Sequence, residues 1–325
     1  MGDSGGSRIR TILVAGAGGY VGSSLVPKLL NSGNRVIAVD TFWFGDHLAD
    51  HENLLKINCD VRNLSADDLP DVNSIIHLAA VANDPSVDLD PNLSWEIGCL
   101  GTRNICEIGL RKSIDTFVLA SSGSVYGIKS EPKVTENLEL VPISVYNKVK
   151  MIKERIVLSY SESFRTVVYR PATICGFSPR LRLDLAVNAL TISALTKGQI
   201  TVFGGEQLRP QLHIDDMILG YEWALSNSEI QGIYNLGFEN DSILDIAQKV
   251  QKIIPSEILI TPSNDPRSYR LDSSKILETG FNPTKTSVAA IFELKEKFEK
   301  KQFKVDDSNF NVTWMTKLIT SGQIR

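Results

Sequence analysis

The first half of the chain alternates short β-rich runs with helical patterns, and this alternation limits the fold more than any other feature. Short apolar runs predict strands at 11–15, 35–39, 74–78, 116–120 and 166–169. Helical spacing of apolar residues lies between them, at 21–30, 95–110 and 146–159. Strands that alternate with helices form a parallel sheet with helices on both faces, joined by right-handed crossovers. The sequence therefore predicts an α/β fold with a doubly wound parallel sheet.

The pattern loosens after residue 171, where prolines and glycines become frequent. Predicted helices at 185–196, 215–226 and 244–253 alternate there with short strands such as 199–203. We assign residues 9–171 to a first domain and 172–300 to a smaller mixed α/β C-terminal lobe that is interleaved with it.

Three further segments have their own predictions. Residues 1–8 are rich in Gly and Ser and are expected to form a disordered leader. Residues 293–301 are dense in charge and are expected to be the solvated face of a last helix. The polar tail at 301–325 is expected to pack either on the body or on a partner chain.

Composition excludes several classes of protein. The 325 residues are 42 % hydrophobic and 22 % charged, with a net charge of −4 and no long basic run, so nothing points to nucleic acid or an anionic membrane. Four scattered cysteines without CxxC spacing suit a reducing compartment and argue against a disulfide framework or a structural zinc site. No apolar run approaches the length of a membrane span, and no signal peptide is visible. We therefore expect a cytoplasmic protein without a metal site.

Residues 16–22 read GAGGYVG, between the first strand and the first helix. Gly16, Gly19 and Gly22 leave room for positive φ and for a pyrophosphate close to the N–H groups of the helix. Asp40 ends the second strand, about 20 residues further on, where a carboxylate binds a ribose diol. The acid repels a 2′-phosphate, and no arginine follows at 41–45 to receive one. The pattern predicts a Rossmann-type site for NAD rather than NADP, with an ordinary βα turn as the weaker alternative.

A second acidic turn, at Asp60 and Val61, follows another short apolar run. The carboxylate could bond an adenine edge, or it could simply cap a helix. The sequence leaves both interpretations open.

Tyr146 and Lys150 are four residues apart in a predicted helix, so their side chains share a face. A free tyrosine has a pKa of about 10, and a nearby ammonium favours the phenolate and lowers that pKa. The pair could remove a proton from a substrate hydroxyl as hydride leaves the carbon for NAD, and return it later. Tyrosine and lysine at this spacing are common, so the hypothesis depends on the dinucleotide turn and on the hydroxyl-rich SSGSVYG at 121–127.

In their order along the chain, these motifs resemble the extended short-chain dehydrogenase/reductase family. They are GAGGYVG, Asp40, HLAA at 77–80, SSGSVYG, YNKVK at 146–150, RPATICG at 170–176 and RPQLHIDD at 209–216. The match covers about residues 9–300 and looks most like the branch that acts on nucleotide-activated sugars, such as UDP-hexose 4-epimerases. The motif set is specific for the family and poorly specific for the substrate.

The resemblance implies roles for the matching positions. Ser122 shares the C4 hydroxyl of the sugar with Tyr146, and Lys150 bonds the nicotinamide ribose and tunes Tyr146. The implied cofactor-binding set is Gly16, Gly19, Tyr20, Val21, Gly22, Asp40, Asp60, Val61, Leu78, Ala79, Ala80, Lys150, Pro171 and Thr173. The implied substrate-binding set is Asn83, Ser124, Arg180, Asn188 and Arg209, of which Asn188 and Arg209 match positions that hold the diphosphate.

Some of these assignments have an alternative of equal weight. Arg180 and its neighbour Arg182 could reach the diphosphate or the sugar, or they could form a surface or inter-lobe ion pair. Asn83 lies in a loop expected near the sugar, and a turn-forming role would explain it as well.

The SSGSVYG segment separates the reactions of the family. Dehydratases that remove water across C5 and C6 resemble one another in an Asp-Glu pair after the Ser/Thr, because they need an acid and a base. Gly123 and Ser124 stand at those places here. Family decarboxylases of UDP-glucuronate tend to carry a Glu where Ser124 stands, and 3,5-epimerases a Cys. All three reactions are disfavoured, which leaves hydride chemistry at one carbon, expected to be C4.

Gly98 departs from the family pattern, because members often show an Asn there that supports the proton relay and the cofactor. Glycine within a helix also costs about 1 kcal/mol relative to alanine. How the backbone of the site is held without that Asn is open at this stage.

Three functions remain for the same residues. The first is a nucleotide-sugar 4-epimerase, and the second is a C4 dehydrogenase that releases the ketosugar. The third is a non-catalytic sensor of NAD(H), which the intact Ser122, Tyr146 and Lys150 argue against. The resemblance also implies a homodimer or larger homo-oligomer through the helices at 95–110 and 146–159.

Overall fold

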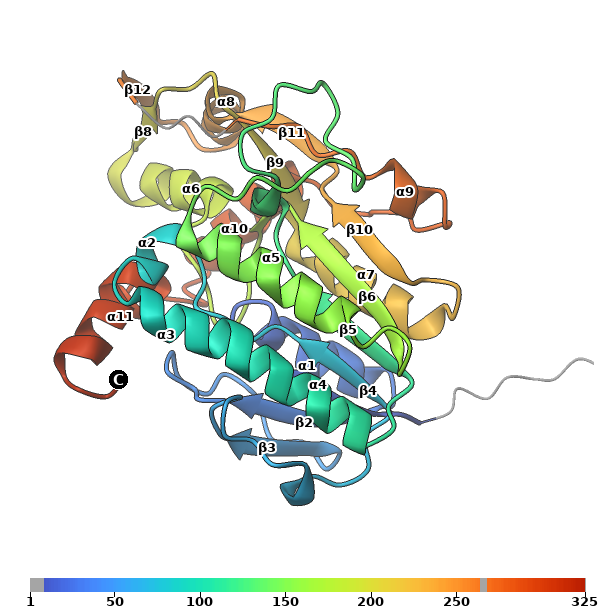
Figure 1. Ribbon diagram of the computed structural model, residues 1–325. Helices are drawn as coiled ribbons and strands as arrows, with labels where there is room; N and C mark the ends of the chain where they lie inside the picture. Colours follow the sequence, from blue (N-terminus) through green and yellow to red (C-terminus); the bar gives the residue numbers. More distant parts are fainter. Residues whose placement is uncertain (1–8, 264–267, 325) are drawn as a thin grey trace, which may run out of the picture.

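A seven-stranded parallel sheet forms the centre of the computed structural model, which describes residues 9–263 and 268–324 (Figure 1). The order across the sheet is β3-β2-β1-β4-β5-β6-β10, and each neighbouring pair runs parallel. The strands are β1 (Thr11–Ala15), β2 (Arg35–Asp40), β3 (Leu54–Asn58), β4 (Ser74–His77), β5 (Thr116–Ala120), β6 (Arg165–Pro171) and β10 (Gly232–Leu236). The predicted leader, residues 1–8, lies outside the described residues.

Helices cover both faces of this sheet. Helices α1 (Gly22–Asn31) and α7 (Ile214–Ser226) pack on one face, and α4 (Thr102–Arg111) and α5 (Val145–Leu158) pack on the other (Figure 1). The strands supply apolar residues to both faces in turn, which is why they read as continuous apolar runs. In β1, Ile12 and Val14 belong to the first core, whereas Leu13 and Ala15 belong to the second. The predicted Rossmann-type, doubly wound parallel sheet is confirmed.

The strand order reverses between β1 and β4. The chain moves from β1 outward to β2 and β3, then returns to the other side of β1 for β4, β5 and β6. Such a switch point opens a crevice at the carboxyl ends of the strands, where ligands bind in folds of this kind.

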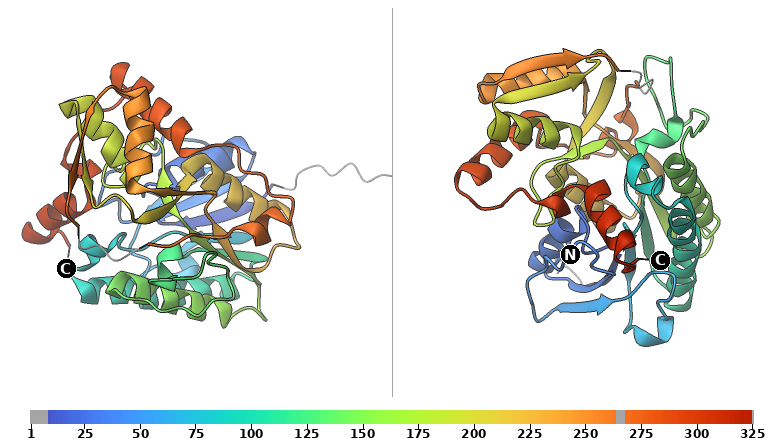
Figure 2. Two further views of the ribbon diagram at one scale, coloured as in Figure 1. Left: turned by 90° about the horizontal axis from the view of Figure 1, so that it is seen from above. Right: turned by 90° about the vertical axis from the view of Figure 1, so that its left-hand side faces the viewer.

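The second part of the chain builds two small sheets. One has the order β11-β9-β7 and mixes parallel and antiparallel pairs, and the other is the parallel pair β12-β8. Helices α6 (Ala186–Lys197), α8 (Ile243–Ile253) and α10 (Ser287–Glu299) cover them (Figure 2). The strands are β7 (Thr173–Cys175), β8 (Gln199–Phe203), β9 (Leu208–His213), β11 (Glu239–Ser242) and β12 (Glu257–Thr261). Strand β10 and helix α7 belong to this stretch of sequence but pack with the large sheet.

The helix predicted at 95–110 is in fact divided. It consists of α3 (Pro91–Trp95), a π-helical turn η2 (Glu96–Gly101) and α4. Gly98 lies in this turn, against α5, where an added Cβ would come within 2.2 Å of Cγ1 of Val149. The glycine therefore allows the two helices to approach closely, which the sequence pattern could not show.

The charge-dense stretch at 293–301 lies largely in a helix, as predicted, but this helix is not the last one. That stretch closes α10, and α11 (Asn311–Thr320) follows it. Met315 and Leu318 of α11 are buried in the second core, so the tail packs on the body of its own chain. The remaining short helices are η1 (Ala66–Asp68), α2 (Asp84–Val87), η3 (Gly123–Tyr126), α9 (Ser274–Leu277) and η4 (Asp307–Asn309). No helix among the described residues is long and apolar enough to cross a membrane.

Candidate active site

A cavity of about 390 Å³ lies at the switch point of the sheet. Its walls come from the loop after β1, the ends of β2, β4 and β5, helix α5, and the second lobe. The predicted residues that line it are Gly16, Gly19, Tyr20, Val21, Gly22, Asp40, Asp60, Val61, Leu78, Ala79, Ala80, Asn83, Ser122, Ser124, Tyr146, Lys150, Pro171, Thr173, Arg180 and Arg209. The structure therefore brings together every predicted site residue except Asn188.

The glycine-rich loop ends in three residues, Tyr20, Val21 and Gly22, that line the cavity and whose backbone N–H groups have no acceptor among the described residues. Gly16 has φ of +88°, and a Cβ there would lie 2.5 Å from the backbone N of Ala79. A Cβ on Gly22 would lie 2.4 Å from the carbonyl oxygen of Gly16, so helix and loop pack directly on each other. No side chain of the described residues caps the amino end of α1. Free N–H groups and the helix dipole together make an anion site, which fits the pyrophosphate of a dinucleotide.

Asp40 is fixed at the end of β2. Its Oδ2 accepts a hydrogen bond from the N–H of Gly18 at 2.9 Å, and its Oδ1 accepts one from the N–H of Phe42 at 2.7 Å. Burial raises the pKa of this carboxyl, and the two N–H donors oppose the rise. The carboxylate lines the cavity beside the glycine loop, as the ribose site of a dinucleotide requires.

Asp60, in the next acidic turn, is paired with a residue of its own loop. Its carboxylate accepts hydrogen bonds from the N–H and the guanidinium of Arg62, with 2.8 Å between Asp60 Oδ2 and Arg62 Nη2. The carboxylate still lines the cavity. Its contact with an adenine stays a prediction.

The reacting end of the cavity presents two hydroxyls and a phenol. Ser122 accepts a hydrogen bond from the N–H of Ser124 and thereby caps the short helix η3, and the two Oγ atoms lie 2.8 Å apart. Helix α5 begins after Ser144, whose hydroxyl caps it, and places Tyr146 in its first turn. Lys150 follows one turn later, and its Nζ donates to the carbonyl of Ala120 at 3.0 Å.

The pKa of Tyr146 departs from the sequence-based prediction. Burial raises the pKa of the phenol above its ordinary value, while the Ser122 hydroxyl and the Arg182 guanidinium oppose the rise. The Nζ of Lys150 lies 5.7 Å from the centre of the tyrosine ring. Burial lowers the pKa of Lys150 to about 8, against an opposing effect of Glu154. The prediction that the Lys150 ammonium lowers the pKa of Tyr146 left out burial, which raises that pKa.

A buried polar network lies next to these side chains, between α5 and the ends of β5 and β6, and the sequence did not predict it. Glu154 lies one helical turn after Lys150 and accepts a hydrogen bond from the hydroxyl of Ser121. The same carboxylate binds Arg170 through two bonds of 3.0 and 2.6 Å. Arg170 also donates to the hydroxyl of Tyr126 at 2.8 Å. Spacing was the available signal, since Tyr146, Lys150 and Glu154 stand at i, i+4 and i+8.

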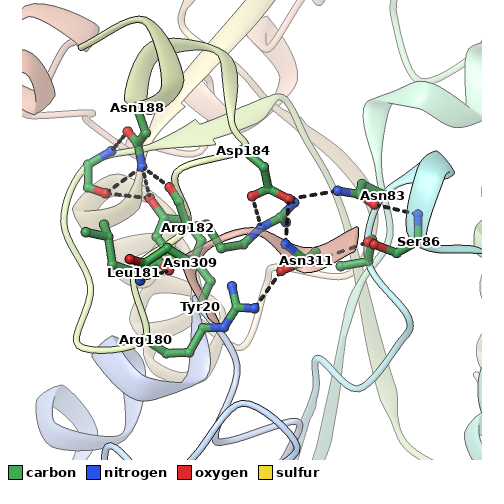
Figure 3. A network of polar contacts seen from close by, with 12 residues as sticks. Tyr20, Asn83, Ser86, Arg180, Leu181, Arg182, Asp184, Asn188, Asn309 and Asn311 are labelled. Atoms are coloured by element: carbon green, nitrogen blue, oxygen red, sulfur yellow. Dashed lines mark hydrogen bonds and ion pairs between the residues drawn. The ribbon is translucent and has the colours of Figure 1, made fainter. Parts of the chain in front are cut away.

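A second network joins the two lobes at the side of the cavity (Figure 3). Arg182 binds Asp184 through bonds of 2.9 and 3.0 Å, and Asp184 also accepts a hydrogen bond from Asn83 at 3.0 Å. Asn188 lies behind them. Its amide oxygen accepts a hydrogen bond from the N–H of Gly176, and its Nδ2 donates to the carbonyls of Gly176 and Arg182. The side chain of Asn188 is fully buried and does not line the cavity. Its role in holding the diphosphate therefore stays a prediction.

The C-terminal helix also reaches the cavity, which no motif had indicated. Asn311 and Met315 of α11 line it, together with Trp43 and Phe44 from the loop after β2. The indole N–H of Trp314 donates to the carbonyl of Trp43 at 2.6 Å. The isolated tryptophan and methionine in a polar tail were the only signal for this contact.

Known proteins with similar sequences settle the family. A model described as the NAD dependent epimerase/dehydratase family matches residues 12–237, which is more than half of the chain. The chain belongs to this family. It is 30 % identical over 297 residues to UDP-glucuronic acid decarboxylase 1 of Xenopus tropicalis, an alignment that covers 84 % of this chain and 68 % of the relative. It is 34 % identical over 262 residues to an uncharacterized UDP-glucose epimerase of Bacillus subtilis (strain 168), covering 74 % of this chain and 81 % of that one.

A solved structure agrees with this assignment. The UDP-glucuronic acid 4-epimerase from Bacillus cereus, in complex with UDP-glucuronic acid and NAD, superposes with a TM-score of 0.79 at 28 % identity. The superposition covers 89 % of this chain and 99 % of that one. The predicted family and the cofactor NAD are thus confirmed. Epimerases, decarboxylases and dehydratases all occur among the similar proteins, so the family leaves the reaction itself undecided.

Proposed function

We propose that this chain is an NAD-dependent nucleotide-sugar epimerase that inverts C4 of the sugar. The observation that carries the proposal is the set of groups around the phenol of Tyr146. Ser122 and Ser124 present hydroxyls there, and Gly123 stands between them, where a lyase of this family needs an acid or a base. A serine hydroxyl is too weak a base to take a proton from carbon at neutral pH.

Each residue at the reacting end then has one task. Tyr146 takes the proton of the C4 hydroxyl and later returns it, and Ser122 hydrogen-bonds the same hydroxyl. The hydrogen bond from Ser122 and the positive charge of Arg182 favour the phenolate against the effect of burial, and the Nζ of Lys150 lies 5.7 Å from the centre of the same ring. NAD, held along the glycine loop, supplies the reversible acceptance of a hydride.

The second lobe supplies the groups for the nucleotide sugar. Arg209 lines the cavity from β9, and its guanidinium suits the oxygens of the diphosphate. Ser124 and Asn83 line the cavity near the catalytic hydroxyls and are assigned to the sugar. The protein is further proposed to be a cytoplasmic homodimer that uses η2, α4 and α5, where Leu100 of η2 and Leu110 of α4 are exposed.

The experiment also has to distinguish two alternative reactions, a single oxidation and a lyase reaction. A dehydrogenase would use the same Ser122, Tyr146 and Lys150 and release the ketosugar. A lyase would need a carboxylate, and Asp84 at the start of α2 lines the cavity near enough to raise the pKa of Tyr146. The relationship to a UDP-glucuronic acid decarboxylase gives that alternative its weight.

Product mass distinguishes these reactions. The purified protein is incubated with UDP-glucose, UDP-glucuronic acid and a panel of GDP- and dTDP-sugars, with and without NAD, and products are resolved by chromatography and mass spectrometry. The expected product has the mass of its substrate and a new retention time. A product lighter by two hydrogens, with NADH accumulating, would establish the dehydrogenase instead. A product lighter by water or by carbon dioxide would refute the argument from Ser122 and Ser124.

Tyr146→Phe is the matched variant for this experiment. It removes only the phenolic oxygen, and it is expected to slow every reaction by about 10²- to 10⁴-fold while NAD still binds. If the protein turns over no substrate and Tyr146→Phe leaves its function unaltered, the result would support a non-catalytic NAD(H) sensor.

A further inference from the structure

Arg180 is a buried cation that no carboxylate among the described residues binds directly. Its side chain is 3 % exposed. Its Nη2 donates to Oδ1 of Asn311 at 2.5 Å, and its Cζ lies 3.9 Å from the centre of the Phe44 ring. The Nε and Nη1 atoms are both buried and have no hydrogen-bond partner among residues 9–263 and 268–324. Burying a charge in this state is unfavourable unless a counter-ion joins it.

Two carboxylates act on Arg180 from a distance, but both have other partners. Asp184 is bound by Arg182 through two bonds. Asp40 accepts hydrogen bonds from the backbone of Gly18 and Phe42. Burial and the neighbouring Arg182 lower the pKa of Arg180 to about 9, even with these two acids nearby. Neither carboxylate therefore forms an ion pair with the guanidinium of Arg180.

The position of Arg180 indicates which anion would serve as its counter-ion. The backbone N–H of Arg180 donates to the hydroxyl of Ser23 in the first turn of α1. The hydroxyl of Ser178, in the same loop, hydrogen-bonds the hydroxyls of Ser23 and Ser24 in that turn. Together with Phe44, these contacts hold the guanidinium beside the amino end of α1. The backbone N–H groups of residues 20–22, at this end, have no acceptor among the described residues. A dinucleotide places its diphosphate at this helix end.

We propose that Arg180 is a ligand of the cofactor's diphosphate and that Asn311 of the C-terminal helix holds it in place. The guanidinium faces the phosphates opposite the N–H groups of the glycine loop, so that the second lobe and the C-terminus complete the NAD site. Helix α11 is anchored for this task by Trp314 on Trp43 and by Nδ2 of Asn311, which donates to the carbonyl of Ala82 at 3.3 Å. This proposal replaces the predicted contact of Arg180 with the sugar nucleotide, and it does not depend on the reaction at C4.

Calorimetric titration of the nucleotide-free protein tests the proposal. NAD, ADP-ribose, adenosine and UDP are titrated into the wild type and into Arg180→Met. A charge-assisted contact to phosphate makes NAD and ADP-ribose bind about 10- to 100-fold more weakly to the variant. Adenosine carries no phosphate and UDP occupies the other half of the cavity, so both are expected to bind unchanged. Arg35→Met removes the same charge from the exposed start of β2 and is the control, with unchanged affinity for all four ligands.

Two results would overturn the proposal. One is unchanged affinity of Arg180→Met for NAD and ADP-ribose. The other is a loss that appears with UDP rather than with ADP-ribose, which would return Arg180 to the substrate site. If Arg180→Met does not fold by circular dichroism, Arg180→Gln replaces it, because a neutral amide still bonds Asn311; the same outcomes apply.

Asn311→Ala tests the contribution of the C-terminal helix. The substitution leaves the charge of Arg180 in place but removes the partner of Nη2. NAD and ADP-ribose are expected to bind a few-fold more weakly, with UDP unchanged. Unchanged binding of all three ligands would refute the role of α11 in the cofactor site.

Discussion

Replacing Glu154 by Gln tests the network beneath the catalytic helix. Glu154 and Arg170 are 2 % and 3 % exposed, and two hydrogen bonds of 3.0 and 2.6 Å join them. The substitution keeps the shape of the side chain but leaves the guanidinium buried without its counter-charge. Breaking a buried ion pair in this way costs about 3–5 kcal/mol. We expect a loss of about 3 kcal/mol in the free energy of unfolding, since the amide oxygen still accepts one hydrogen bond.

Urea unfolding followed by circular dichroism at pH 7 measures this loss. Glu162→Gln removes a charge from an exposed position and is the control, with a change below about 0.5 kcal/mol. Adding Arg170→Met to Glu154→Gln removes the stranded cation, so the double variant is expected to be more stable than Glu154→Gln. A single variant within about 1 kcal/mol of the wild type, or a double variant equal to the sum of the two single losses, would refute the reasoning.

The same substitution has a second expected effect, on the pH dependence of turnover. The Glu154 carboxylate opposes the fall in the pKa of Lys150, which burial lowers to about 8. Without the carboxylate, the pKa of Lys150 falls further. Lys150 is charged below its pKa, so the alkaline limb of the kcat/KM profile is expected to move to lower pH. An alkaline limb in the same place would show that Glu154 acts on stability alone.

Three further predictions concern neighbouring residues. Tyr146→Phe is expected to lower kcat by about 10²- to 10⁴-fold with NAD affinity unchanged in fluorescence titration, and a smaller loss would show that another group transfers the proton. Gly98→Ala forces a methyl group against Val149 and is expected to cost about 1–3 kcal/mol in urea unfolding, which Val149→Ala added to it should largely restore. Lys153 is fully buried with its pKa well below the ordinary value, so the unfolded chain binds the extra proton and wild-type stability rises with pH. Lys153→Met should therefore be more stable than the wild type near pH 7, by a margin that shrinks towards pH 10; a margin independent of pH would contradict this.

Much of the cofactor half could be predicted because its signals are local in sequence. The glycine loop, Asp40 and the pair Tyr146 and Lys150 each depend on spacing within one turn, strand or helix. Such spacing decides the fold class and the side chains that share a face. The cavity at the switch point then follows from the strand order.

The parts that could not be predicted depend on contacts between distant segments. Arg180 and Asn311 are 131 residues apart, so no local pattern predicts the hydrogen bond between them. The π-helical turn at Gly98 follows from the approach of Val149, which periodicity does not report. The pKa of Tyr146 is governed by burial, and a count of neighbouring charges along a helix leaves burial out.

The position of α11 has a consequence for synthesis of the protein on the ribosome. Domains form from the amino end as the chain emerges, so β1 to β6 and the glycine loop are available early. Asn311, Trp314 and Met315 are translated well after β6, and they line or brace the cavity. A nascent chain can thus build its sheet while one wall of the cavity is still inside the exit tunnel. Closure of that wall can follow only after α11 has left the tunnel, so the cavity is completed later than the sheet that carries it.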